Sequence, residues 1–150
     1  MPPRLEGEIM GITITAANSK YDFFLGYGGF FSLRKNIASA YNKEFGEHYG
    51  NLIYCHTPRQ FEEHDKISNL LISQLDPDEK DADIFDFLYQ SDCSGKISYK
   101  TCKKIYDLIK DIDFGDRIFT YGANSDGKDY EYLKEFLKEC YSHRRQMRWE

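Results

Sequence analysis

TPRQFEEHDKISNLLISQL, residues 57–75, is the stretch that indicates most clearly which kind of fold this chain adopts. Its start is typical of a helix N-terminus, because Thr57 can cap free backbone N–H groups, Pro58 suits the first turn and Gln60 completes a capping box. The apolar residues that follow share one face of that helix, and we expect this face to be buried. They are Phe61, Ile67, Leu71 and Leu75.

Downstream of this helix the pattern repeats. Asp76, Pro77 and Glu79 predict a second helix start, and the turn SDCSGK at residues 91–96 separates that helix from a third. Residues 117–122 (RIFTYG) predict a short strand, and residues 124–127 (NSDG) predict a turn before a last helix. The apolar stripes of these three helices are Ile84, Phe85, Phe87 and Leu88; Tyr99, Cys102, Ile105, Tyr106 and Ile109; and Tyr130, Leu133, Phe136, Leu137 and Cys140.

Upstream, strand and helix signals are mixed. Residues 11–15 (GITIT) and 21–25 (YDFFL) predict a short hairpin, and residues 51–55 (NLIYC) predict a further strand. Ser32 is a suitable N-cap for a helix that carries Leu33 and Ile37 and closes at Gly46. The whole pattern predicts a helix-rich single α+β domain at residues 10–150, with about five helices and a small antiparallel sheet or hairpin. Residues 1–9 are expected to form a flexible N-terminal extension.

Composition excludes several classes of protein. The 150 residues include no apolar run long enough to span a membrane, and the four cysteines form no CxxC pair, so we expect a cytoplasmic protein with reduced thiols. The formal net charge of −5 disfavours binding to nucleic acid through the whole surface. No cofactor motif is present, and we predict no cofactor.

The glycine-rich segment LGYGGFFSLRK, residues 25–35, is the strongest candidate for ligand binding. Glycines just before a helix can form a backbone cradle for an anion, nearby cations can add charge, and aromatic rings can stack on a base. The alternative is structural, because the same glycines can form a hairpin turn or bulge beneath packed aromatics. The predicted ligand-binding residues are Tyr27, Gly28, Gly29, Phe30, Arg34 and Lys35.

Other constellations carry weaker signals for metal binding. Cys55, His56, Cys140 and His143 could hold zinc if their segments met, although neighbouring strand residues point to opposite faces. Residues 90–101 imitate a calcium-binding EF-hand loop, but Gln90 and Thr101 stand where the strongest carboxylate ligands are needed. We therefore assign no metal site.

Two further features could carry other functions, and each has an ordinary structural explanation. Arg144, Arg145, Arg148 and Trp149 could form a basic and aromatic patch, while cations also stabilise the end of a helix. Cys55 could be a nucleophile, but no surrounding signature supports that role. We therefore assign no catalytic residue.

Four segments together resemble a group of uncharacterised small proteins from bacterial prophages and mobile elements. They are GYGGFFSLRKNIA, EFGEHYGNLIYC, DFLYQSDCSGKISYKTC and KDYEYLKEFLKEC. The resemblance implies a phage or mobile-element context but no activity. With it, we expect a non-enzymatic binding protein that counters host defence, by masking a host defence protein or by sequestering a small anionic, nucleotide-like signal. The alternative is a small enzyme acting on a phosphate-bearing or nucleotide substrate.

Overall fold

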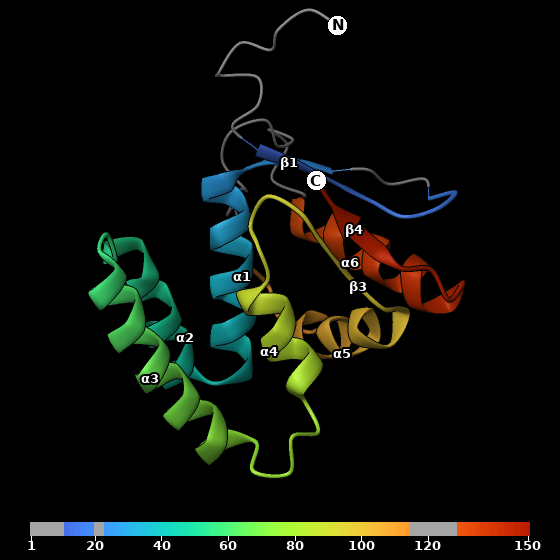
Figure 1. The fold of residues 1–150 in the computed structure, drawn as a ribbon. Coiled ribbons are helices and arrows are strands. Elements are labelled where there is room, and N and C mark those ends of the chain that lie inside the picture. The colour runs from blue at the N-terminus through green and yellow to red at the C-terminus, as the bar shows by residue number, and fades with distance from the viewer. Residues whose placement is uncertain (1–10, 20–22, 115–128) are drawn as a thin grey trace, which may run out of the picture.

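The computed structural model describes residues 11–19, 23–114 and 129–150. The described part contains a small antiparallel sheet and six α-helices, which confirms a helix-rich single α+β domain (Figure 1). The elements in chain order are β1 (Gly11–Thr15), β2 (Phe23–Gly26), α1 (Tyr27–Tyr41), α2 (Lys43–Gly50), the 3₁₀ helix η2 (Asn51–Tyr54), α3 (Pro58–Leu75), α4 (Ala82–Tyr89), β3 (Gly95–Ile97), α5 (Tyr99–Ile109), α6 (Asp129–Ser142) and β4 (Met147–Trp149).

The sheet has the strand order β2-β1-β4-β3, and every neighbouring pair is antiparallel. Alternation of side chains along each strand places one face of the sheet against the helices. The buried residues of that face are Ile12, Ile14, Leu25, Ile97, Met147 and Trp149. The predicted hairpin of β1 and β2 is confirmed, whereas β4 was not predicted, because MRW is short and lies among arginines.

The helices form the core with the sheet on one side (Figure 1). Helix α1 packs against both α2 and α5, α5 packs along α6, and α2 lies between α1 and α3. The predicted stripes of α4, α5 and α6 are confirmed, since their apolar residues are buried or half-buried in this core. Helix α3 is different, because its fully buried side chains are only His64 and Ser68.

Several predicted helix ends are wrong. Helix α1 begins at Tyr27, so Ser32 is inside the helix and does not cap it. The helix predicted to run to Gly46 is two helices, because Asn42 is extended and its side chain accepts a hydrogen bond from the backbone of Phe45, which starts α2. Gly46 instead lets α2 approach α1, since a Cβ there would lie 2.4 Å from the Cα of Ser39.

Two more local predictions are corrected, and one is confirmed. Residues 51–54 form a 3₁₀ helix rather than a strand. Asp76 ends α3 instead of starting the next helix, because its carboxylate accepts the backbone N–H groups of Lys80 and Asp81 in the connecting turn. The capping box of Thr57 and Gln60 is present as predicted.

Some predictions lie outside the described residues. These are the N-terminal extension at 1–9, the strand at 117–122 and the turn at 124–127. Among the helices that the structure does describe, none combines the length and the apolar character needed to cross a bilayer.

Candidate functional site

The predicted ligand-binding residues divide between the surface and the core. Tyr27, Gly28 and Gly29 form the first turn of α1, and a Cβ on Gly28 would meet nothing within 4 Å. Lys35 is exposed two turns later. Phe30 and Arg34 are instead almost completely buried, at 0% and 5% exposure, so they lie in the core and not on a ligand surface.

Arg34 holds the loop that follows α4. Its guanidinium donates to the backbone carbonyl oxygens of Leu88, Gln90 and Ser91, at 3.3, 2.8 and 3.2 Å. The guanidinium carbon also lies 4.2 Å from the centre of the Phe30 ring. Burial lowers the pKa of Arg34, yet a guanidinium stays charged in proteins.

Residues 90–101, whose sequence imitates an EF-hand loop, begin beside Arg34. The carbonyl oxygens at the start of the loop face a guanidinium, which supplies the positive charge that a metal ion supplies in a calcium loop. The indole N–H of Trp149 donates to Ser91 as well, at 3.0 Å. Gly95 leaves room for that indole, because a Cβ there would lie 2.1 Å from the ring. The loop is therefore a structural junction between α1, α4 and the sheet.

The four residues considered for zinc do not form a site. Cys140 is buried in α6 beside Cys102, while Cys55 ends η2 and His56 is exposed next to it. His143 is exposed just after α6. Within residues 11–19, 23–114 and 129–150, no group of three or more histidine, cysteine or acidic side chains is placed to hold a metal ion.

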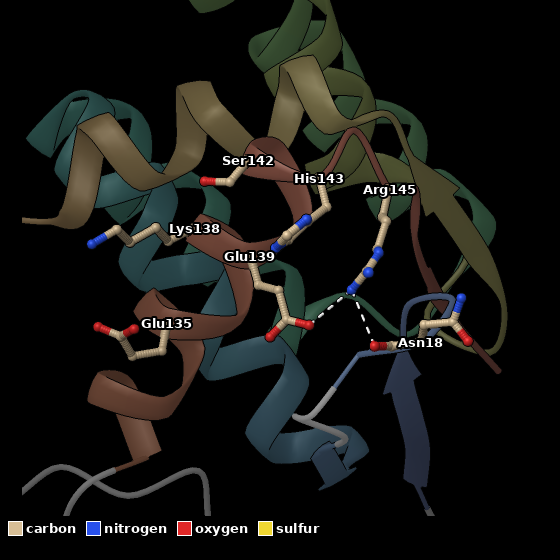
Figure 2. Close-up of a pocket in the computed structure, with 7 residues that line it drawn as sticks. All are labelled: Asn18, Glu135, Lys138, Glu139, Ser142, His143 and Arg145. Atoms are coloured by element: carbon tan, nitrogen blue, oxygen red, sulfur yellow. Dashed lines mark hydrogen bonds and ion pairs between the residues drawn. The ribbon is translucent and has the colours of Figure 1, made fainter.

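A hollow of about 500 Å³ lies beside the C-terminal half of α6 and the turn after β1. Figure 2 shows Arg145 reaching from the end of α6 toward Glu139 and the backbone oxygen of Asn18, with N–O distances of 2.9 and 3.1 Å. The charge of Arg145 is therefore already used to join α6 to the hairpin turn. Trp149 is 1% exposed, so the predicted basic and aromatic patch does not exist in that form.

The strongest surface feature lies on η2 and α3. Five large apolar side chains there are exposed, from 44% for Phe61 to 72% for Tyr54. The predicted burial of Phe61 and Ile67 is therefore wrong, because α3 packs on α2 through the side that carries His64 and Ser68. Ile53, Tyr54 and Ile67 line two adjoining hollows, and Leu70 follows Ile67 by one turn of α3. Phe61 lies on the opposite side of that helix from Leu70. We call Ile53, Tyr54, Ile67 and Leu70 the docking surface.

Two hollows flank Tyr54 on the docking surface and share Asn51. One, of about 460 Å³, is lined by residues of α1, α2 and η2, which are Phe31, Ser32, Lys35, Glu47, Gly50, Asn51, Ile53 and Tyr54. The other, of about 270 Å³, lies between η2, α2 and α3 and is lined by His48, Asn51, Tyr54, Cys55, Gln60, Glu63, His64 and Ile67. Lys35 is thus the predicted ligand residue that reaches this site.

A pair of histidines joins α3 to α2 beneath the docking surface. The rings of His48 and His64 are stacked with their centres 3.9 Å apart. Each ring donates through Nε2 to the backbone oxygen of the other residue, at 3.1 Å from His48 and 2.8 Å from His64. The hydroxyl of Ser68 lies 2.9 Å from His48 Nε2 and accepts a hydrogen bond from Tyr89 at 3.0 Å.

Cys55 lines the smaller hollow but has no catalytic partner in the described contacts. Its sulfur lies 3.8 and 3.9 Å from the backbone oxygens of Asn51 and Gln60. The described contacts of the thiol are with these backbone oxygens and not with a ring nitrogen of His48 or His64. The geometry of this site suits binding better than nucleophilic chemistry.

The sequence does not reveal the docking surface, because apolar residues at helical spacing predict a buried helix face. No local signal distinguishes Ile67 from the buried apolar residues of α5 or α6. Comparison with known proteins gives no information about function. Searches against protein-family models, curated proteins and solved structures found no match to this chain.

Proposed function

We propose that the protein is a non-enzymatic binding protein that holds another protein through the docking surface. The observation that carries the proposal is the exposure of four large apolar side chains, Ile53, Tyr54, Ile67 and Leu70, at and beside two adjoining hollows on η2 and α3. Contiguous apolar side chains at the surface are typical of sites where proteins bind one another. The two hollows beside Tyr54 offer pockets for anchoring side chains of the partner.

The charges around this surface favour a partner with apolar anchors and a basic rim. Glu47 and Lys35 both line the larger hollow. The exposed charges of α3 are Glu62, Glu63 and Asp65 against Arg59 and Lys66, which leaves a small excess of carboxylates, and Glu63 is paired with Arg59. The chain as a whole carries a formal net charge of −5. Carboxylates at these positions repel an anionic membrane and attract the lysines and arginines of a protein rim. In the phage or mobile-element context that the resemblance implies, the partner is a host defence protein that is masked by this contact.

A direct test uses paired variants of exposed apolar residues. Leu70→Glu places a charge in the docking surface, and Phe24→Glu places the same charge on β2, where Phe24 is also exposed. A photo-crosslinking amino acid at position 54 is expected to capture one protein in host cells. Leu70→Glu should abolish that product and Phe24→Glu should keep it. Capture that is insensitive to Leu70→Glu contradicts the proposal.

The defence context is tested separately by phage plating. A host with an active defence system should plate a restricted phage more efficiently when it expresses the wild-type protein or Phe24→Glu, and should lose that gain with Leu70→Glu. If the wild-type protein produces no gain against any defence system, the masking role is wrong, whereas the crosslinking result still reports on the binding surface.

A second candidate function is capture of a small anionic, nucleotide-like ligand in the larger hollow. Lys35 supplies a cation there, and Phe31 and Tyr54 supply rings for stacking. Glu47 on the same wall opposes an anion, which makes protein binding the better reading. Native mass spectrometry of the purified protein decides this point, because a co-purifying nucleotide that is lost in Lys35→Met would favour the ligand.

A further inference from the structure

The histidine pair, His48 and His64, is the main attachment of the N-terminal part of α3. Over residues 58–70, the side chains that are fully buried are those of His64 and Ser68. The C-terminal turns of the helix have apolar anchors of their own, since Leu71, Ile72 and Leu75 are half-buried against the core. Loss of the contact between the two histidines would therefore release residues 58–70 while leaving the end of α3 in place.

The hydrogen bonds of the pair require a proton on Nε2 of both rings, which a neutral and a charged imidazole can each supply. Each imidazole donates through Nε2 to a backbone oxygen, and the rings lie face to face. Two positive charges at a centre-to-centre distance of 3.9 Å would repel strongly in a half-buried setting. A charge on His48 alone is already opposed by burial beside the second ring, so protonation of His48 weakens the stacked arrangement.

The surroundings offer only partial compensation for such charges. On η2 and α3 the titratable groups beside the pair are Tyr54, Cys55 and Glu63, which line the same hollow, and Asp65, whose charge acts on Tyr89. On α2 they are the exposed carboxylates of Glu44, one turn before His48, and Glu47, directly before it. Glu63 is exposed and forms an ion pair with Arg59 at 3.2 Å. From α4 the contribution is the neutral hydroxyl of Tyr89, through Ser68. Exposed carboxylates of this kind are screened by water and cannot neutralise two stacked imidazolium rings.

We propose that the histidine pair makes the docking surface sensitive to pH; this inference rests on the proposed function. At neutral pH the N-terminal part of α3 is attached to α2, and in mild acid it is released. The smaller hollow is lined by both histidines and by Tyr54 and Ile67, so release of α3 dismantles that hollow. The partner should then bind at neutral pH and dissociate in acid.

The direction of the effect follows from His48. Burial, followed by the neighbouring His64, lowers the pKa of His48 below its ordinary value. The native state therefore binds fewer protons than the unfolded chain, so the contribution to stability is complete above the unfolded histidine pKa of about 6.5. It is lost as the pH falls through the lower native pKa. Protection of α3 should decrease below about pH 6.5 and stay constant above it.

Hydrogen exchange of the free protein tests the switch without any partner. Protection factors, which are corrected for the pH dependence of intrinsic exchange, are compared at about pH 7.5 and about pH 5.5. In the wild type we expect residues 60–70 to lose protection, by at most about tenfold for one titrating histidine, while α5 and α6 change by clearly less. In His48→Gln the amide can still donate to the oxygen of His64 but cannot be charged, so the loss should disappear. His143→Gln, an exposed histidine after α6, should behave like the wild type.

The outcomes separate the switch from the docking function. Equal protection of residues 60–70 at both pH values in the wild type overturns the switch, and so does an unchanged pH response in His48→Gln that circular dichroism shows to be folded. If α3 opens as expected but the crosslink at position 54 is equally strong at both pH values, the switch stands and the docking surface is wrong.

Discussion

Replacement of Arg34 by methionine is the sharpest test of how the structure uses this residue. Methionine keeps most of the apolar volume but removes the guanidinium and its three hydrogen bonds. Leu88 O keeps the hydroxyl of Tyr49 as a donor at 2.8 Å, and Ser91 O keeps the indole of Trp149. The oxygen of Gln90 loses the shortest of the three bonds, and no other described residue donates to it.

The expected loss of stability is moderate and measurable. A hydrogen bond from a charged donor contributes about 1.5–3 kcal/mol, and a carbonyl left without a donor costs about 1–3 kcal/mol when it is buried and less when, like that of Gln90, it is half-buried. Removal of the guanidinium also removes the cost of burying its charge, and this gain offsets part of the loss. Part of that cost comes from Arg34 Nε, a buried atom for which the described residues provide no hydrogen-bond partner. We expect Arg34→Met to lower the free energy of unfolding by about 3 kcal/mol, which lowers Tm by about 6–12 °C in a chain of this size.

Urea and thermal denaturation followed by circular dichroism measure this loss, and Lys35→Met is the matched control. Lys35 is the next residue and is exposed, so its replacement should change stability by less than about 0.5 kcal/mol. If Arg34→Met is as stable as the control, Arg34 does not hold the loop after α4. A role for Arg34 in ligand binding would then have to be reconsidered.

Other predictions concern backbone positions. Gly46→Ala should destabilise the protein by more than about 2 kcal/mol in urea denaturation, because its Cβ would meet the backbone of Ser39, and a neutral result would contradict the close packing of α1 and α2. Gly28→Ala should instead raise the free energy of unfolding by up to about 1 kcal/mol, since the space beside it is open and alanine favours a helix. A large loss of stability in the same assay would contradict the open space beside Gly28. Arg144→Gly should stabilise by about 1 kcal/mol in the same assay, because Arg144 has a φ of 54°, and unchanged stability would show that this conformation is relaxed in the protein. Thr57→Ala should cost about 1 kcal/mol and increase hydrogen exchange in the first turn of α3, and equal exchange would mean that the capping box contributes little.

The parts of the fold that the sequence predicts are those with strong local signals. The capping box at Thr57 and the apolar stripes of α4, α5 and α6 specify helices through neighbours in sequence. The end of α1 is harder, because Asn42 and Gly46 acquire their roles from the way α2 folds back on α1. Strand β4 forms through pairing with β1 and β3, which are far away in the chain. Its three residues show too short a pattern to predict a strand.

The candidate site was predictable only in part, for related reasons. Lys35 was identified as a surface cation and lines the larger hollow. Arg34, one residue earlier, points the opposite way into the core, which a glycine-rich motif cannot reveal. The exposure of Ile67 and Leu70 depends on how few elements pack on α3, and that is a property of the tertiary structure.

The central position of β4 has a consequence for the order in which the protein can be completed. Strand β1, near the start of the chain, is joined to β3 only through residues 147–149. During synthesis, the ribosome must therefore finish these residues and release them from its exit tunnel before the sheet can close. Until then Ile12 and Ile14 lack the cover of Trp149, and pairings over so long a sequence separation form slowly. Nascent chains stalled before residue 147 should be cut rapidly by protease in β1, and the same strand should become resistant after release.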